Sequence, residues 1–369
     1  MSLIFLFDYD GVLTHKKDFV QSIADRYQLN VEAIRRSFAQ YLQACLRGKG
    51  DLIQLLEGQL NNIGWAGSAQ GLYDAIYKKD KQHNENMLQL IREDILDIFP
   101  AHLATNQDFH RCRVLAIESV IQELFVKIYC SADIGYAKPE QQYFEHIYAD
   151  LLEEQPDLQK RQLVFIDDQK DNVDQAARIG LTAHHFQDLE RFKQFLENLW
   201  EDLPFPILSH ERFSLSRMQM SHAEGYSDIL SEKSTYHYLT ASGPVNPQQA
   251  IQKIRKNQRA CRKGSSLYWS ILGNDGSFLG YIAAHNLQQS EVALSYGIHP
   301  AFRRQGYGSA ALKVLLFWKG LTNKRIQLAT HLDNHASFRL LSNMALSYQG
   351  VQKTSIGDRH VFIRQAIHP

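Results

Sequence analysis

Three short apolar runs separated by long helical stretches constrain the fold of the first 200 residues most strongly. The runs are residues 3–7, 101–104 and 163–166, and turn residues bound them. Short, fully apolar runs of this kind are typical of strands buried on both faces. Strands that alternate with helices form a parallel sheet, so the sequence predicts an α/β fold with a doubly wound, Rossmann-like parallel sheet over residues 1–200.

A helical segment interrupts this alternation after the first strand. Val31, Ile34, Phe38, Tyr41 and Cys45 recur at spacings of three and four, as on one face of an amphipathic helix. Two more helical runs are expected at residues 52–60 and 87–96. We therefore expect an inserted helical cap at about residues 15–90 that covers one end of the sheet.

The sequence changes character after residue 200. Residues 201–211 carry two prolines and are predicted to be a linker. Extended runs at residues 266–273, 278–287 and 291–298 then predict a meander of antiparallel strands, followed by helices from about Ser309 and His335 on either side of a strand at 326–331. The chain of 369 residues is long enough for about two domains, so residues 212–369 are predicted to form an α+β domain with a mixed, mostly antiparallel sheet.

The composition excludes some classes of partner. Forty basic and forty acidic residues give no net charge, so the whole chain offers no broad field for nucleic acid or an anionic membrane. No apolar stretch approaches the length of a membrane span, and the N-terminus lacks the pattern of a signal peptide. The four scattered cysteines show no metal-ligand spacing and are expected to be reduced core residues. These features favour a soluble, cytoplasmic protein.

Polar residues follow the predicted strands of the first domain at the point where each strand ends. Asp8 and Asp10 follow the first run, with Gly11 beside them, Thr105 and Asn106 follow the second, and Asp167 and Asp168 follow the third. Lys138 precedes Pro139, which is expected in the first turn of a helix. An isolated Asp-Xaa-Asp-Gly is more often a solvated turn or a calcium loop. Here the carboxyl ends of parallel strands converge, so these residues are expected to meet.

Four acids in one crevice would repel one another unless a cation is present. A small set of hard oxygen ligands with room left for water and phosphate favours Mg²⁺ over Zn²⁺ or a tight Ca²⁺ cage. With Lys138 and the Thr105 hydroxyl, the crevice would also carry the positive charge and the donor that a phosphoryl group needs.

The four segments FDYDGVLT, LATNQ, GYAKPE and VFIDDQKDNVDQAARIG, in this order, resemble the motifs of the haloacid dehalogenase (HAD) superfamily, subfamily I with a helical cap. The resemblance implies that Asp8 attacks phosphorus and forms an aspartyl-phosphate, and that Asp10 protonates the leaving oxygen and then activates water. It further implies that Gly11, Thr105, Asn106 and Lys138 bind phosphate, that Asn172 orients Lys138, and that Asp8, the Asp10 carbonyl, Asp167 and Asp168 bind Mg²⁺. An acid at position 10 favours phosphoryl transfer over dehalogenation.

A second glycine-containing pattern lies between a predicted strand and a helix. Arg303, Gly306 and Gly308 form Arg-Xaa-Xaa-Gly-Xaa-Gly, in which backbone amides and a helix N-terminus could hold a pyrophosphate. By itself the pattern is equally compatible with a tight turn into a helix. A dinucleotide fold is disfavoured because antiparallel strands precede the pattern.

The segments EVALSYGIHPAFRRQGYGSAALKVLLFW and HLDNHASFRLLSNMAL are similar to GNAT acetyltransferases, nearest to the branch of ribosomal-protein N-terminal acetylases. The likeness implies that residues 293–298 splay from the neighbouring strand and pair with the pantetheine arm of acetyl-CoA. It implies cofactor contacts from Ile298, Arg303, Arg304, Gln305, Gly306, Tyr307, Gly308, Ser309, Asn334 and Ser337. Two departures are Leu341, where many members have a tyrosine acid, and Ala345-Leu346 in place of Gly-Phe. Glu291 is a candidate base, and Tyr296 or His299 a candidate relay, although an ordinary surface or core role is the alternative for each.

Together these resemblances predict a bifunctional chain: a Mg²⁺-dependent phosphatase for a small phosphorylated metabolite, fused to an acetyltransferase that uses acetyl-CoA and an amine acceptor. Three alternatives stay open at this point. The first domain could be a phosphomutase, or it could transfer a glyceryl or acyl unit, and the second could be a non-catalytic acyl-CoA sensor. His102 is expected to be a hydrogen-bonded core residue, the basic run 253–263 a solvated helix face, and the pair His184-His185 not a metal site.

Overall fold

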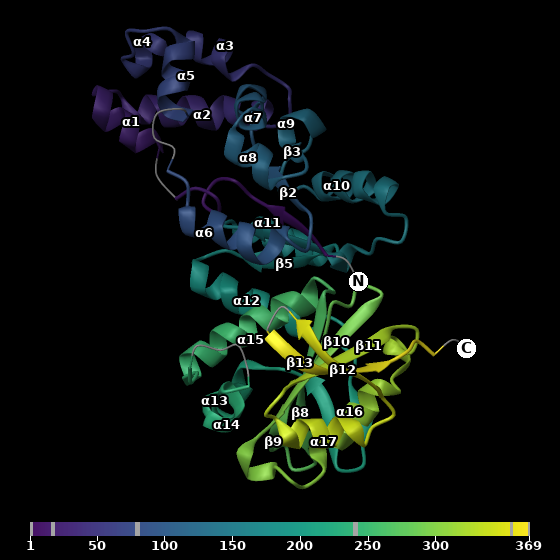
Figure 1. The fold of residues 1–369 in the computed structure, drawn as a ribbon. Helices are drawn as coiled ribbons and strands as arrows, with labels where there is room; N and C mark the ends of the chain where they lie inside the picture. Colours follow the sequence, from purple (N-terminus) through teal and green to yellow (C-terminus); the bar gives the residue numbers. More distant parts are fainter. Residues whose placement is uncertain (1–2, 16–18, 78–81, 239–242, 355–356, 368–369) are drawn as a thin grey trace. The chain divides into compact units, whose positions relative to one another are not determined.

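The computed structural model describes residues 3–15, 19–77, 82–238, 243–354 and 357–367. It divides into two compact units, Met1–Leu203 and Pro204–Pro369, which are drawn in Figure 1. Within the described ranges, no helix is both long enough and apolar enough to span a bilayer.

The first unit is built on a five-stranded sheet of the order β3-β2-β1-β4-β5. Its strands are β1 (Ile4–Phe7), β2 (Ala101–Thr105), β3 (Ile128–Cys130), β4 (Leu163–Asp167) and β5 (Thr182–His185), and all pair in parallel. β1, β2 and β4 are buried along their whole length because helices cover both faces of the sheet. The predicted doubly wound α/β fold is confirmed.

Side chains of β1 alternate between two helical layers. Phe5 and Phe7 pack in a core with helix α6 (Glu85–Leu90), the π-helical segment η1 (Ile91–Leu96), α8 (Ser119–Leu124) and α12 (Leu189–Glu201). Ile4 and Leu6 pack on the opposite face against α10 (Gln141–Glu154) and α11 (Lys170–Arg178). Helix α10 begins two residues after Pro139, so the expectation that this proline lies in the first turn is wrong.

Five helices form a separate cluster inserted between β1 and β2. They are α1 (Phe19–Tyr27), α2 (Val31–Cys45), α3 (Leu52–Glu57), α4 (Leu60–Ile63) and α5 (Ala69–Tyr77), and they share one apolar core. The side chains of Asn30 and Asp51 accept hydrogen bonds from the first turns of α2 and α3, which defines where these helices begin. Met87 and Leu90 of α6 pack instead in the core of the sheet, so this cap ends at α5 rather than near residue 90.

The cysteines differ from expectation. Helix α7 (Phe109–Ala116) follows β2, and the short helix α9 (Ser131–Ile134) follows β3, and a 3₁₀ turn η2 (Lys160–Gln162) leads into β4. Because β2 and β3 are neighbours in the sheet, Cys112 of α7 and Cys130 of β3 come within a Cα–Cα distance of 6.3 Å and form a disulfide. Cys45 and Cys261 are not in a disulfide. The expectation of four reduced cysteines is therefore wrong for one pair.

The second unit contains an eight-stranded sheet of the order β12-β13-β11-β10-β9-β8-β7-β6. The strands are β6 (Leu208–His210), β7 (Phe213–Arg217), β8 (Ser266–Gly273), β9 (Phe278–His285), β10 (Glu291–Ile298), β11 (Arg325–His331), β12 (Ser347–Thr354) and β13 (Gly357–Arg364). Among the strand pairs of the described residues in this unit, only β10–β11 is parallel, so the predicted mixed, mostly antiparallel sheet is confirmed. Strand β6 falls inside residues 201–211, so this segment is not wholly a linker.

Helices cover both faces of this sheet. On one face, α16 (Tyr307–Leu316) and α17 (His335–Ser342) share a core with Trp269 of β8 and Leu294 of β10. On the other face, α13 (Ala223–Ser231) and α15 (Pro247–Arg262) pack around Tyr281 of β9. Short helical segments complete the unit: η3 (Met220–His222), α14 (Lys233–Tyr236), η4 (Pro300–Phe302) and η5 (Lys319–Leu321).

His102 is a buried titratable residue of the first domain. It lies in β2 at 3% exposure, and its Nδ1 has no hydrogen-bond partner among the described residues, so the expected hydrogen-bonded histidine is only partly right. Burial, with a smaller effect of Lys127, lowers the pKa of His102 to about 4. The unfolded chain then binds a proton that the folded chain does not, and stability falls as the pH drops from about 6.5 toward 4.

We expect His102→Leu to remove this pH dependence. Between pH 7 and pH 5 the wild type should lose at most about 2 kcal/mol of unfolding free energy through this group, and the variant should lose correspondingly less. Urea unfolding at both pH values measures the difference. Equal losses in the two proteins would contradict the assignment.

Candidate active site and cofactor cleft

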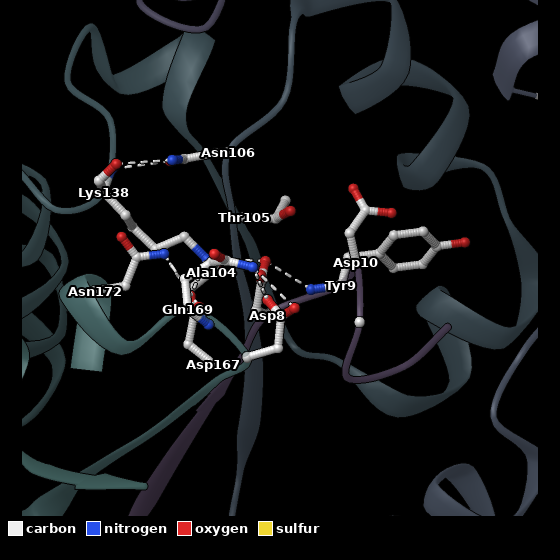
Figure 2. A network of polar contacts seen from close by, with 12 residues as sticks. Asp8, Tyr9, Asp10, Ala104, Thr105, Asn106, Lys138, Asp167, Gln169 and Asn172 are labelled. Atoms are coloured by element: carbon white, nitrogen blue, oxygen red, sulfur yellow. Dashed lines mark hydrogen bonds and ion pairs between the residues drawn. The ribbon is translucent and has the colours of Figure 1, made fainter. Parts of the chain in front are cut away.

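Asp8 and Asp167, at the ends of β1 and β4, both contact Lys138. The Lys138 Nζ lies 2.8 Å from the Asp8 Oδ1 and 2.7 Å from the Asp167 Oδ2, and it donates to the Ala104 carbonyl at 2.8 Å. Figure 2 shows these side chains converging. The side chain of Lys138 is 1% exposed and that of Asp167 is 0% exposed, so both charges are held away from water. Three of the residues predicted from separate motifs thus form one cluster.

A third carboxylate completes a possible cation site. Oxygens of Asp8, Asp167 and Asp168 lie within 4.8 Å of one another. A Cβ at position 11 would come within 2.5 Å of the Asp168 carboxylate, and φ there is +79°, so only glycine permits this approach. Burial raises the pKa of Asp8 to about 7; Lys138 opposes the shift and Asp167 adds to it. One lysine therefore does not balance the buried acids, and the oxygen donor set fits Mg²⁺.

Asp10 is held apart from this cluster, as Figure 2 shows. Its carboxylate receives two hydrogen bonds from Arg111, at 2.6 and 2.7 Å, and one from the Gln107 Nε2 at 2.9 Å. Burial by itself would raise the pKa of Asp10, but the Arg111 charge and these hydrogen bonds outweigh it and hold the pKa below its usual value. Arg111 in turn lies 4.7 Å from the centre of the Tyr77 ring.

Sequence reasoning missed Arg111 and Gln107. Arg111 lies in the first turn of α7, and Gln107 lies just before the N-cap residue of that helix. A spacing of four residues across the start of a helix can bring two side chains together, which was the signal available. Nothing in the spacing indicates that these side chains would face Asp10.

The remaining predicted phosphate ligands are engaged with the protein. The Thr105 Oγ1 is fully buried and accepts from the Gln107 Nε2 at 2.9 Å. The Asn106 amide exchanges two hydrogen bonds of 2.9 Å with the backbone of Lys138 and so positions the lysine loop. Asn172 donates to both Asp167 oxygens, at 3.1 and 3.0 Å, so it acts on Lys138 through Asp167 rather than directly.

A cavity of about 420 Å³ opens over these residues. Its polar lining comes from the strand ends, the loops after them and the helices α7 and α11: Asp8, Asp10, Gly11, His15, Asn106, Arg111, Lys138, Asp168, Gln169 and Asn172. Its apolar lining comes from the cap. A volume of this size fits a small-molecule site.

Polar contacts tie the cap to the sheet domain. The Tyr73 hydroxyl of α5 donates to both Asp108 oxygens at 3.0 Å, and His110 lies 2.9 Å from Asp51. Arg47, just beyond α2, contacts Glu140 at 3.2 Å. These contacts hold the cap over the cavity in the arrangement described.

In the second unit, β10 separates from β11. The parallel register runs from Glu291↔Arg325 to Ala293↔Gln327 and then stops, whereas β10 stays paired with β9 as far as Ile298↔Gly280. The register therefore leaves the backbone of residues 294–298 without strand pairing on the β11 side. The splay predicted for residues 293–298 thus begins one residue later, at residue 294.

The glycine loop turns from β10 into α16. Gly306 is the N-cap of α16 with φ +84°, and Arg304 also has a positive φ of +61°. Arg303 donates to the Ile298 carbonyl at 3.1 Å and pairs with Glu232 at 3.1 Å. Further contacts define the rest of the loop: the Ser309 hydroxyl donates to the Gly306 carbonyl, the Gln305 carbonyl accepts from Arg212, and Arg212 stacks on Tyr307. A Cβ at position 308 would lie 3.4 to 3.5 Å from side-chain atoms of Ile298, Tyr296 and Leu340.

The remaining candidate residues of this unit, for cofactor binding and for proton transfer, have different partners. Asn334 caps α17 by accepting from the Ser337 N–H at 3.1 Å, and the Ser337 hydroxyl lies 3.0 Å from that of Tyr296. His299 is 3.2 Å from Asp228. Glu291 pairs with Arg325 at 3.1 Å, in the part of β10 that is still paired with β11. Glu291 is therefore a poor candidate for the base.

Three residues that the sequence did not indicate form a hydrogen-bonded chain near the point where β10 separates from β11. The His285 Nε2 lies 2.8 Å from the Ser295 Oγ, and its Nδ1 lies 3.3 Å from the Tyr268 hydroxyl. Burial lowers the pKa of His285, which favours the neutral ring. Ser295 stands two residues beyond Ala293, where pairing with β11 ends.

Comparisons with known proteins agree with this division. Residues 212–346 match a family model described as an acetyltransferase (GNAT) domain. A curated relative, the sesquiterpene phosphatase astK of Aspergillus oryzae, is 30% identical over 105 residues, which are 28% of this chain and 50% of the relative. The chain thus spans about half the length of that relative.

Solved structures show weaker similarity. A protein from Porphyromonas gingivalis described as a predicted HAD-like family hydrolase aligns with a TM-score of 0.44 and 18% identity, over 55% of this chain and 100% of its own. RimJ of Mycobacterium smegmatis, solved with CoA-disulfide, aligns with a TM-score of 0.39 and 17% identity, over 44% of this chain and 88% of its own. The match of residues 212–346 to the GNAT acetyltransferase model and the similarity to a curated phosphatase support the predicted fusion of a HAD-like domain with a GNAT domain.

Proposed function

We propose that the first domain is a Mg²⁺-dependent phosphatase that hydrolyses a small phosphate ester. The observation that carries the proposal is the position of Asp8, held by Lys138 beside Asp167 and within 4.8 Å of a third carboxylate. Asp8, Asp167 and Asp168, with the Asp10 carbonyl, would hold the cation, which would neutralise charge on the phosphoryl oxygens. Similarity to a phosphatase supports the same class of reaction.

Asp8 would attack phosphorus, forming an aspartyl-phosphate while the ester oxygen leaves and takes a proton. Water would then attack this intermediate and give up a proton as phosphate is released. Asp10 is the group proposed for both proton transfers. Its contact with Arg111 favours the carboxylate, which is the form that accepts the proton from water. For the first transfer Asp10 has to carry a proton, so this contact would have to be released when the ester binds. Lys138 would hold Asp8 oriented and screen its charge.

Phosphate release from a panel of phosphate esters with Mg²⁺, compared between wild type and Asp8→Asn, tests this function. Release by the wild type alone supports it. Isomerisation of a sugar phosphate without net release would indicate the phosphomutase alternative. Inertness of the magnesium-loaded wild type toward the whole panel would refute phosphatase activity.

For the second domain we propose acetyl transfer from acetyl-CoA to an amine. The separation of β10 from β11 favours it, because unpaired strand backbone offers hydrogen bonds to the amides of a pantetheine arm. Residues 303–309 and the N-terminus of α16 would receive the pyrophosphate, with Ile298, Asn334 and Ser337 beside the arm. The non-catalytic alternative predicts acetyl-CoA binding without transfer to any amine.

The Ser295–His285–Tyr268 chain is proposed to carry the proton released by the amine. His285→Gln and Ser295→Ala should each lower kcat for acetyl transfer about 10²-fold, with little change in the Kd of acetyl-CoA. Transfer kinetics and calorimetry measure the two quantities. Ser270→Ala is a matched control, since Ser270 bonds to a different half-buried histidine, His222, at 2.7 Å. Unchanged kcat in both relay variants would refute the relay.

A further inference from the structure

The cavity of the first domain has two chemically different sides. The side formed by the strand ends and their loops carries the charged and polar groups described above. Of the described lining residues, the cap contributes Val20 from α1, Phe38 from α2, and Ile76 and Tyr77 from α5. Three helices thus present apolar or aromatic side chains to the same space.

Packing contacts fix the position of this apolar wall, which consists of Val20, Phe38, Ile76 and Tyr77. Ile76 is 3% exposed, and the rings of Phe38 and Tyr77 lie 6.5 Å apart, centre to centre. Tyr77 also packs against the Arg111 guanidinium, which links the wall to the charged side. The only polar atom in the four side chains is the Tyr77 hydroxyl.

The two sides prefer different parts of a substrate. The charged side suits a phosphoryl group, which leaves the carbon body of the substrate facing the wall. A body with several hydroxyls would lose hydrogen bonds to water there and find few replacements, which weakens its binding. An apolar body would instead gain affinity with each methylene that the wall buries.

We propose that this site takes phosphate esters of apolar alcohols, aliphatic or aromatic, in preference to sugar or polyol phosphates. The inference rests on the proposed phosphatase function and deepens it by naming the class of alcohol. The cap wall sets the specificity, and the strand ends supply the reactive groups.

The test compares kcat/KM for ethyl, butyl and hexyl phosphate with that for glycerol 3-phosphate and glucose 6-phosphate, using the full-length protein with Mg²⁺. We expect kcat/KM to rise along the alkyl series and hexyl phosphate to exceed glycerol 3-phosphate by about 10-fold or more. Equal or better turnover of the hydroxylated esters would overturn the inference and leave the phosphatase function standing.

Variants locate the preference on the wall. Val20→Thr keeps the shape of the side chain and adds a hydroxyl, and Phe38→Gln replaces a half-buried ring, so each should lower the hexyl-to-glycerol ratio several-fold. Phe38→Leu should keep most of it. Gln70→Ala is the control, because Gln70 is an exposed residue of the cap helix α5 whose side chain bonds to Asp74 and does not line the cavity. An unchanged ratio in both polar variants would refute the role of the wall.

Binding separates this inference from the function on which it depends. Calorimetry should show hexylphosphonate binding about 10-fold tighter than 3,4-dihydroxybutylphosphonate, a phosphonate with a hydroxylated chain, whether or not any ester is hydrolysed. Absence of turnover with this preference intact would refute the phosphatase and support the apolar site. Equal affinities would refute the apolar site.

Discussion

Asp8→Asn is expected to lower phosphate release by about 10³-fold or more with any substrate that the wild type accepts. The amide keeps nearly the size and shape of the carboxylate but is a far weaker nucleophile toward phosphorus. KM should change much less than kcat, because substrate binding depends on the remaining groups of the cavity. Steady-state phosphate release and a single-turnover search for a phosphorylated protein, in both forms, measure the effect.

Two controls accompany this variant. Asp174→Asn removes an exposed acid of α11 that pairs with Lys170, and it should leave the rate within about 2-fold, as is usual for an exposed ion pair. Circular dichroism and thermal unfolding show whether Asp8→Asn still folds. A folded Asp8→Asn protein with wild-type kcat would contradict the nucleophile assignment.

Lys138→Met is expected to cause the largest loss of stability. It removes the cation that lies 2.7 to 2.8 Å from two buried carboxylates, and an uncompensated buried charge costs about 3 to 5 kcal/mol. Methionine keeps the length and most of the volume of the lysine stem, so the loss reflects charge rather than a cavity. Urea unfolding without divalent cations measures the change in the free energy of unfolding.

The effect of Mg²⁺ on the stability of Lys138→Met tests the proposed cation site. If Asp8, Asp167 and Asp168 bind Mg²⁺, the cation should stabilise the variant more than the wild type, because it supplies charge that the variant lacks. Lys127→Met is the matched control: its pair with Asp150 is partly exposed and is worth about 1 kcal/mol or less. A Lys138→Met protein as stable as Lys127→Met without cations would contradict the charge balance proposed for the site.

The cluster of Asp8, Lys138 and Asp167 could be predicted in part because residues at the carboxyl ends of parallel strands lie at the same edge of the sheet. Asp8 and Asp167 lie at the carboxyl ends of apolar runs that can only be buried strands, and such ends meet in a parallel sheet. The opening beyond Ala293 was likewise expected, from the similarity of its segment to acetyltransferases. At the strand ends and beyond Ala293, the local sequence pattern was therefore enough to predict the arrangement.

Other contacts could not be predicted because they join segments whose sequences place no condition on each other. Arg111 and Asp10 are 101 positions apart, and the pairing depends on how α7 is rotated about its axis. Cys112 and Cys130 meet because β3 lies beside β2. Ser295, His285 and Tyr268 come from three strands whose relative register sets their hydrogen bonds.

The sequence by itself determined which residues form strands, where acids and lysine follow those strands, and that two domains of different type are joined. Only the tertiary structure decided that Asp10 is held by Arg111, that the cap ends at α5, and that four apolar side chains face the reactive groups. The physical reason is that periodicity and turn residues act over a few positions. Side-chain partners, in contrast, are selected by the packing of elements that are distant in the chain.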